Sequence, residues 1–277
     1  MTQPQHPGRP TVCVVGSTNV DLVVKCQSLP RPGETISGGI FHRSPGGKGA
    51  NQALAAAHAG AVTTFVGAVG DDGLGDEALA TLRSSGVDLS RVVTVSGTAT
   101  GVALIAIDAA GENQIAVAPG ANHKLNPGDL EVGGFDAVLC QMEIRDDTLA
   151  AAAAGATGLL VLNAAPARII PESVLERSDI VIVNETENAF LAEQLQQFGG
   201  TLIVTEGARG ATAFQRGARL ASAVPPRVDA IDTVGAGDAF CGTLTARLAG
   251  GVELSEALER ACEAGAVAAT QAGAQAG

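Results

Sequence analysis

An aspartate in the last fifth of the chain, Asp238, has surroundings suited to proton transfer. It directly follows the run Gly235-Ala236-Gly237 and stands at the start of an Ala- and Leu-rich segment, 237–249, that is expected to be a helix. The first amides of a helix have no partner within the helix and carry partial positive charge, so they can bind an anion. The pattern therefore indicates a place for an anion beside an acid that can accept a proton.

Further polar residues lie in or directly after strand-like segments. Asn19 and Asp21 are two residues apart, so on a strand their side chains share a face and could clamp neighbouring hydroxyl groups. A polar turn with an Asx hydrogen bond is the alternative for this pair. Glu143 follows an apolar run, where a parallel sheet presents ligand-binding residues, although a solvated loop acid has the same pattern.

The glycine-rich stretch "SPGGKGANQA", residues 44–53, could bring the backbone close to a ligand, with Lys48 adding a cation and Asn51 an amide. A P-loop does not fit, because Gly49 follows the lysine where Ser or Thr is needed to hold magnesium. The first strand is not followed by a G-x-G-x-x-G fingerprint either, which disfavours a dinucleotide-binding fold. A glycine-rich helix start without a ligand remains the alternative.

Two later segments also follow strand-like runs. In "VNETE", residues 183–187, Asn184, Glu185 and Glu187 at a helix start favour helix capping, and they could instead hold a hydrated magnesium ion. The segment "TEGARG", residues 205–210, is a strand end with a glycine turn that could border a nucleotide.

Apolar strand-like runs alternate with helical runs over most of the chain. Such alternation predicts an α/β fold in which helices cover both faces of a parallel sheet, giving three layers, with ligands at the carboxyl ends of the strands. The expected strands are 11–16, 62–66, 136–140, 159–162, 179–183 and 201–205, and the expected helices are 49–60, 75–86, 146–154, 171–177, 185–198, 237–249 and 255–271.

Two segments, 20–43 and 92–118, interrupt this alternation. Both have the pattern of hairpins with Pro and Gly turns and no helix between their strands. We expect them to form a small β-sheet that projects from a single domain, 11–277, and acts as a lid that excludes water from a ligand. The exposed face of such a sheet needs a partner, so the sequence predicts a homodimer through the lid.

Composition narrows the classes of partner. The net charge of −12 disfavours binding to nucleic acid or to an anionic membrane surface. No apolar run approaches the ~20 residues of a membrane span, and the polar segment 1–10 has the pattern of a loose leader. The cysteines are odd in number and lack metal-type spacing, so free thiols in a reducing cytoplasm are expected at Cys13, Cys26, Cys140, Cys241 and Cys262.

Taken together, these segments resemble the ribokinase-like family of sugar and nucleoside kinases. The resemblance runs from about Thr11 to the last residue, in the family's order and at similar spacing. It implies ATP-dependent phosphorylation of ribose at its 5-hydroxyl, or of another pentose, a deoxy sugar or a nucleoside; a sugar-binding regulator without kinase activity is the alternative from another class. The segments that carry it are "GSTNVDLVVKCQSLPRPGETISGG", "SPGGKGANQALAAA", "TGVALIAID", "GENQIAVAPGAN", "CQME", "NAAPAR", "VNETE" and "DTVGAGDAFCG".

The resemblance also assigns roles. Asp238 is implied to accept the proton of the sugar hydroxyl as that oxygen attacks the γ-phosphate of ATP, with the amides of Gly235, Ala236 and Gly237 as the anion hole. The implied sugar-binding residues are Asn19, Asp21, Gly47, Lys48, Gly49, Asn51 and Glu143, with Val117 of the lid over the apolar face of the sugar. The implied ATP-binding residues are Asn184, Thr205, Glu206, Gly207, Ala208, Arg209, Gly210, Gly237 and Cys262.

The same resemblance implies that the protein binds two kinds of metal ion. Glu187 is implied to lie near the magnesium shell. A monovalent activator, usually potassium, is implied to bind Asp232 and the carbonyl groups of Val234, Ala268, Gln271 and Gly273. A last family ligand, commonly a serine, aligns with Gly277, and the segment between Asn184 and Gly207 is shorter than is usual in the family.

Overall fold

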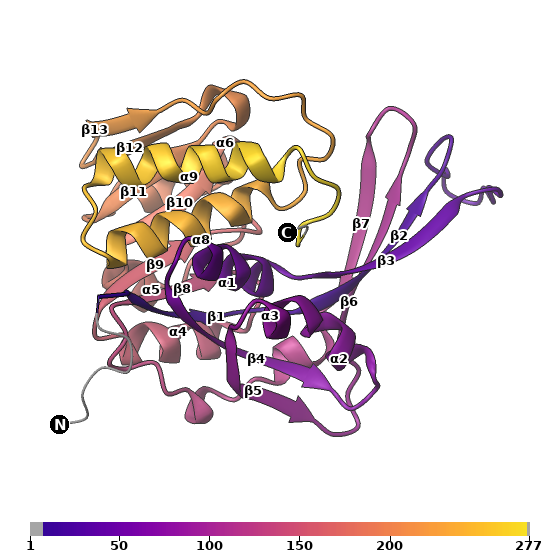
Figure 1. The fold of residues 1–277 in the computed structure, drawn as a ribbon, viewed down its shortest axis with the longest axis horizontal. Coiled ribbons are helices and arrows are strands. Elements are labelled where there is room, and N and C mark those ends of the chain that lie inside the picture. The colour runs from indigo at the N-terminus through magenta and orange to yellow at the C-terminus, as the bar shows by residue number, and fades with distance from the viewer. Residues whose placement is uncertain (1–7, 276–277) are drawn as a thin grey trace.

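A large twisted sheet forms the centre of the molecule, which the computed structural model describes for residues 8–275 (Figure 1). Within these residues the order of its nine strands is β13-β12-β11-β10-β9-β8-β1-β4-β5, and neighbouring strands from β11 to β5 are parallel. The strands are β1 (Thr11–Val15), β4 (Val62–Gly70), β5 (Asp88–Val95), β8 (Ala137–Gln141), β9 (Leu159–Asn163), β10 (Ile180–Asn184), β11 (Thr201–Thr205), β12 (Ala211–Gln215) and β13 (Ala218–Ala223).

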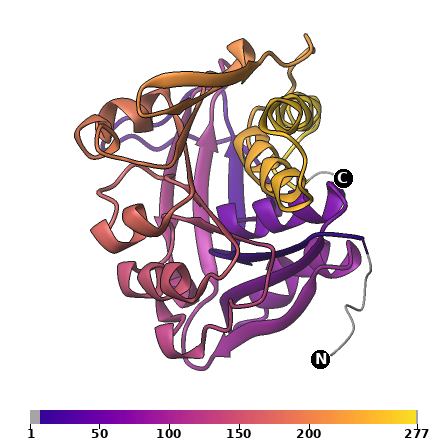
Figure 2. The ribbon, with the colours of Figure 1, turned by 90° about the vertical axis from the view of Figure 1, so that its left-hand side faces the viewer.

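Helices cover both faces of this sheet, so the expected three-layer α/β fold is confirmed (Figure 2). Alternate residues of a strand point to opposite faces, and in β1 this sends Val12 and Val14 into one core and Cys13 and Val15 into the other. The first face carries α1 (Lys48–His58), α3 (Ala80–Ser84), α8 (Ala236–Ala249) and α9 (Leu254–Ala268), and the second carries α4 (Asp146–Gly155), α5 (Glu172–Arg177), α6 (Glu185–Phe190) and α7 (Ala192–Leu195).

A small second sheet projects from the end of the large one (Figure 1). Its order is β3-β2-β6-β7, with bounds β2 (Asn19–Lys25), β3 (Ile40–Gly46), β6 (Gly101–Ile107) and β7 (Asn113–Ala118). The expected lid segment 92–118 begins too early, because residues 92–95 end β5 and pair with β4 in the large sheet. A β-rich run does not itself specify which sheet it joins.

The other differences concern segment boundaries. The expected helix 75–86 is interrupted at Leu79 between α2 (Leu74–Ala78) and α3, and the expected helix 185–198 is divided into α6 and α7. The antiparallel pair β12–β13 was not predicted, and its tight turn places Arg216 and Gly217 at positive φ. Short 3₁₀ helices occur at Gly120–Lys124, Pro127–Asp129 and Gly207–Arg209.

Residues 1–7 of the expected leader lie outside the described residues. In the part of the chain that the structure covers, no helix combines the length and apolarity needed to cross a membrane.

Candidate active site

Asp238 lies in the first turn of α8, where its carboxylate meets two amide donors from α1. Asn51 Nδ2 donates to Asp238 Oδ2 at 2.9 Å, and Gln52 Nε2 donates to Asp238 Oδ1 at 2.8 Å. The two helices can approach this closely because Gly242 lacks a side chain; a Cβ there would lie 2.3 Å from the carbonyl oxygen of Gln52. The residue is 8% exposed, and these two amides orient its carboxylate.

The backbone ahead of Asp238 makes a sharp turn into α8. Gly235 caps the helix in the left-handed region, with φ 82°, which glycine adopts without strain. The amide of Ala236 donates to the carbonyl oxygen of Thr233 at 3.3 Å, so this member of the expected anion hole is engaged in a turn. A Cβ on Gly237 would meet no atom within 4 Å, and the space beside this first-turn amide is therefore open.

Glu143, Asp21 and Lys48 join the same site. Glu143 Oε2 accepts hydrogen bonds from the Ser17 hydroxyl and from the amide of Lys48, the latter at 3.1 Å. Burial raises the pKa of Asp21 to about 6, with smaller contributions from the carboxylates of Glu143 and Asp238 and an opposing one from Lys48. The carboxylate of Asp238 is the main cause of the raised pKa of Lys48, which stays protonated. Three acids and one cation, all buried or partly buried, therefore act on one another electrostatically.

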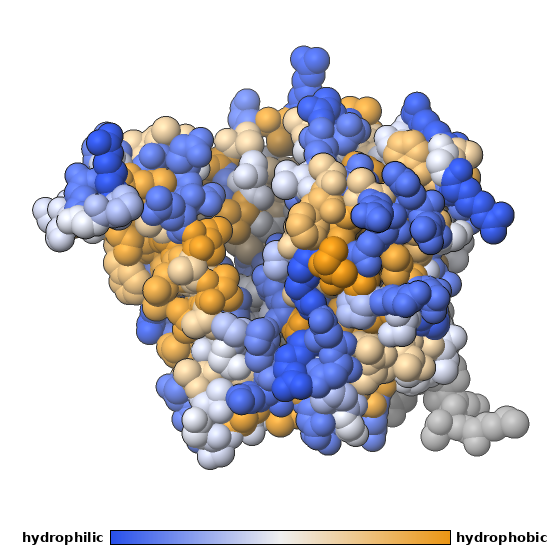
Figure 3. Space-filling view, turned by 180° about the vertical axis from the view of Figure 1, so that it is seen from behind, coloured by the Kyte–Doolittle hydropathy of each residue, from blue (hydrophilic) through white to orange (hydrophobic). Residues whose placement is uncertain are grey.

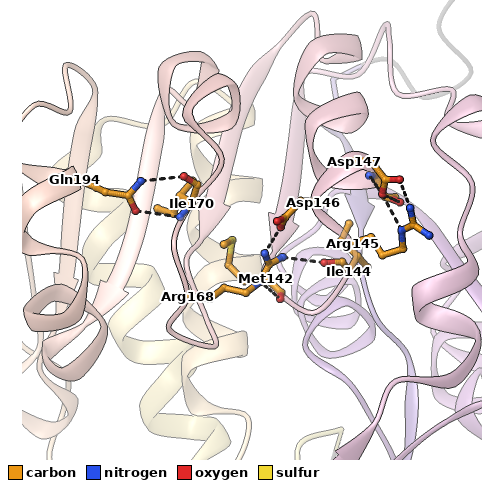
Figure 4. A network of polar contacts seen from close by, with 9 residues as sticks. Met142, Ile144, Arg145, Asp146, Asp147, Arg168, Ile170 and Gln194 are labelled. Atoms are coloured by element: carbon orange, nitrogen blue, oxygen red, sulfur yellow. Dashed lines mark hydrogen bonds and ion pairs between the residues drawn. The ribbon is translucent and has the colours of Figure 1, made fainter.

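A network behind the site fixes the loop that carries Glu143 (Figure 4). Arg168 donates from Nε to the carbonyl oxygen of Met142 and from a terminal nitrogen to that of Ile144, both at 2.8 Å. It also pairs with Asp146. Met142 and Ile144 are buried in the core of the second face, whereas Glu143 between them bonds to Ser17 and Lys48 in the site.

Asn19 and Asp21 lie on β2 and share a face, so the strand interpretation holds and the Asx turn does not. Asn122 Nδ2 donates to Asn19 Oδ1 at 2.8 Å, which fixes the orientation of this buried amide. In the lid, Ala103 pairs with both Asp21 and Val117, so Val117 lies on the face that carries Asp21. Val117 itself is 52% exposed.

The expected glycines lie where backbone segments meet. Gly47 caps α1 with φ 91°, in the region that favours glycine. A Cβ on Gly49 would lie 2.6 Å from the backbone of Gly16 and Ser17, so only glycine permits this approach of α1 to the end of β1.

At the neighbouring strand ends, Asn184 and Glu187 form a capping box at the start of α6. Asn184 Oδ1 accepts from the amide of Glu187, and Glu187 Oε2 accepts from the amide of Asn184, both at 2.8 Å. The capping interpretation is therefore confirmed. The pKa of Glu187 is raised by burial, and Lys48 and Asp238 also act on it, so its carboxylate lies within the field of the site.

The expected nucleotide-binding segments lie at the same edge of the sheet. Asn184 pairs with Thr205 at the ends of β10 and β11, and the turn Gly207–Arg209 follows directly. Cys262 of α9 lies in the core beside β13, where its thiol approaches the carbonyl oxygen of Ala223 at 3.7 Å. Ala223 pairs with Ala211, directly after Gly210, so Cys262 is next to the end of the segment 205–210. Burial raises the pKa of this thiol to about 11, as for a buried structural cysteine.

The carboxylate of Asp232 links the loop before α8 to the segment 268–273 at the end of α9, and the expected potassium ligands come from these two segments. Its Oδ1 accepts from the amide of Val234 at 3.0 Å and its Oδ2 from the amide of Gly273 at 3.1 Å. Among residues 8–275 no group of three His, Cys, Asp or Glu side chains could hold a metal ion, and Gly277 lies outside the described residues.

Sequence reasoning assigned no role to several buried amides that the structure brings to the site. Gln141 and Asn163 end β8 and β9, so the strand-end rule that singled out Glu143 also applies to them. Gln52 lies within a helix and Gln275 beyond the last one, where no local pattern signals a site. The amides without an assigned role are Gln52, Asn122, Gln141, Asn163 and Gln275.

Comparison with known proteins identifies the family. The family model described as pfkB family carbohydrate kinase matches residues 9–277. A ribokinase of Bacillus subtilis (strain 168) is 35% identical over 96% of this chain and 95% of its own. The structure resembles the crystal structure of ribokinase from Thermotoga maritima, with TM-score 0.87, 30% identity and coverage of 96% of this chain and 95% of that one. It also resembles Arabidopsis thaliana ribokinase complexed with ribose and ATP, with TM-score 0.85, 29% identity and coverage of 97% and 95%. The chain belongs to the pfkB family of carbohydrate kinases.

Proposed function

We propose that this protein phosphorylates D-ribose at its 5-hydroxyl, with ATP as phosphoryl donor, to give ribose 5-phosphate and ADP. The observation that carries the proposal is the position of the Asp238 carboxylate at the N-terminus of α8. Two side-chain amides of α1 orient it, and the carboxylates of Asp21 and Glu143 belong to the same site. The ribokinases to which the chain is similar support the choice of sugar.

In this reaction the 5-oxygen of ribose attacks the γ-phosphorus of ATP. The new oxygen–phosphorus bond forms as the bond to the β-phosphate oxygen breaks, and Asp238 accepts the hydroxyl proton. The open space beside Gly237 suits the transferring group, because the first-turn amide of Gly237 and the positive end of α8 would stabilise the negative charge that develops there. Lys48 adds a permanent positive charge to the pocket.

Ribose recognition is assigned to the polar side chains around this base. Carboxylates and amides on rigid strand ends accept and donate to several hydroxyl groups at once, which discriminates strongly against sugars that lack one of them. Val117 lies on the lid face that carries Asp21 and would cover the apolar side of the sugar. The proposed sugar ligands are Asn19, Asp21, Gly47, Lys48, Gly49, Asn51 and Glu143.

ATP is assigned to the strand ends at Asn184 and residues 205–210. Magnesium, which neutralises phosphate charge in such reactions, uses few protein carboxylates and keeps several waters. One oxygen of Glu187 is taken by the capping box, so the other fits a role in holding a magnesium-bound water. Potassium is assigned to Asp232, Val234 and the segment 268–273. Asp232 already links these two parts of the chain, because its carboxylate accepts from the amides of Val234 and Gly273.

We also propose a homodimer through the outer face of the lid, in the cytoplasm, where the five free cysteines would stay reduced. Leu22 pairs with Leu104, and Val24 pairs with Phe41, so these residues share the face opposite to Asp21. They line an apolar hollow, and hydrophobic side chains gather on the lid in Figure 3. An exposed apolar patch of this kind is typical of an interface between subunits.

A coupled assay for ADP across a panel of sugars and nucleosides, with and without potassium, tests the proposal. Ribose should give the highest kcat/KM. If 2-deoxyribose, another pentose or adenosine is turned over faster than ribose, that compound is the substrate and the assignment of ribose is wrong. Calorimetric binding of ribose without any turnover at saturating ATP would instead favour a sugar-binding regulator.

A further inference from the structure

We infer that Gln52 is a positioning residue that holds the carboxylate of Asp238 in its productive orientation, an inference that rests on the proposed function of Asp238. Gln52 lies on α1 and has no exposed surface, so it cannot reach a ligand itself. Its Nε2 donates to Asp238 Oδ1 at 2.8 Å and to Asn163 Oδ1 at 2.9 Å. Both hydrogens of this amide are thus committed to protein acceptors.

The orientation of Gln52 is itself determined by its surroundings. Asn163 Nδ2 donates to the carbonyl oxygen of Ile182 at 3.3 Å, which turns the Oδ1 of Asn163 toward Gln52. Gln141 Nε2 donates to Gln52 Oε1 at 2.7 Å. A reversed Gln52 amide would place its oxygen against two acceptors, Asp238 Oδ1 and Asn163 Oδ1. The chain of amides therefore delivers an N–H group, and not an oxygen, to Asp238.

This donor has a specific consequence for proton transfer. Asn51 holds one oxygen of Asp238 and Gln52 holds the other, so the plane of the carboxylate is fixed from both ends. Each oxygen keeps a further lone pair, and the substrate hydroxyl must approach one of them. Asn51 is also a proposed sugar ligand, whereas the fully buried Gln52 acts only through Asp238. Loss of the Gln52 side-chain donor should therefore slow the chemical step and leave ribose binding intact.

The variant Gln52→Met keeps the length and approximate volume of the side chain and removes its hydrogen bonds. We expect kcat to fall ~10- to 100-fold, the cost of a misplaced catalytic group, with the ribose Kd from calorimetry within about twofold of wild type. Gln52→Leu removes the same donor with a slightly smaller apolar side chain and should show the same pattern if the methionine variant folds poorly. Circular dichroism melts verify that each variant is folded.

A matched control is Gln194→Met. Gln194, on α7, likewise makes two hydrogen bonds, to the amide and carbonyl of Ile170 (Figure 4), and neither of them involves a residue of the proposed site. It should retain wild-type kcat, because it makes the same chemical change without contact with Asp238.

A double-mutant cycle with Asp238→Ala separates positioning from general destabilisation. If Gln52 acts through Asp238, adding Gln52→Met to Asp238→Ala should leave the residual rate unchanged. Wild-type kcat in folded Gln52 variants, or an independent further loss in the double variant, would overturn the inference. If Asp238→Ala alone keeps its activity, the proposed function fails instead, so the two failures are distinguishable.

Discussion

Gln275 donates a hydrogen bond of 2.9 Å from its side-chain amide to Oδ1 of Asn51, although 224 residues separate the two in sequence. Asn51 in turn donates to Asp238, so the segment after α9 supports a residue of the proposed sugar site. Both Gln275 and Asn51 are buried, which makes their pairing energetically important.

We predict that Gln275→Ala raises the KM for ribose about 3- to 10-fold, because an unpaired buried acceptor on Asn51 costs on the order of 1 kcal/mol. The kcat should change less than the KM, since Gln52 still holds Asp238. Steady-state kinetics measures both, with the exposed Gln197→Ala as control. An unchanged KM would show that Asn51 does not depend on this support.

The variant Asp21→Asn should remove one contribution to the pH dependence of stability. The folded protein raises the pKa of Asp21 from 3.8 to about 6, chiefly through burial. Its proton is therefore held more tightly when folded, and the stabilisation, complete below the unfolded pKa, is lost as pH rises through 6. Between pH 5 and pH 8 the wild type should lose about 1–2 kcal/mol more unfolding free energy than Asp21→Asn.

Urea denaturation at both pH values measures this difference, and parallel losses in the two proteins would contradict it. The same variant should bind ribose more weakly, because an ionised carboxylate accepts hydroxyl groups better than an amide does.

Gly237→Ala should separate folding from catalysis. The added methyl group meets no protein atom within 4 Å and favours the helix, so the Tm should stay equal or rise. It would stand in the space proposed for the phosphoryl group, and kcat should fall ~10-fold or more. Gly250→Ala, at the other end of α8 and with ordinary contacts, is the control. Full activity in Gly237→Ala would show that the phosphoryl group does not occupy the space beside residue 237.

Asp232→Ala should abolish activation by potassium. Wild-type activity is expected to be higher in potassium than in sodium, and the variant should show equal, reduced activity in both salts. Asp229→Ala, an exposed acid in the same loop, should behave as wild type. A wild-type enzyme that responds equally to the two cations would show that no activating site forms here.

Leu104→Asp should disrupt the proposed dimer. Leu104 is 55% exposed on the outer face of the lid, where a buried charge without a partner would oppose association. Light scattering after size exclusion should give half the wild-type mass for this variant and the full mass for Leu220→Asp, which lies on β13. A monomeric wild type would contradict the proposal.

The layered fold and the edge of the sheet that carries the site followed from local patterns. A buried strand is a continuous apolar run, and polar residues directly after it, such as Glu143 and Asn184, are visible in one dimension. The helix start at Asp238 was predictable because glycines and an Ala-rich run are adjacent in sequence. The boundary at residues 92–95 was not, because strand pairing depends on the partner that comes within reach.

The sequence by itself determined the α/β class, the lid and the acid at the start of α8, since each depends on neighbouring residues. Only the tertiary structure decided that Gln52, Asn163 and Gln275 support that acid. Their hydrogen bonds join residues 111 to 224 positions apart. Such bonds form only where the packing of α1, α8 and the strand ends places donor and acceptor within about 3 Å of each other, and no local pattern encodes that distance.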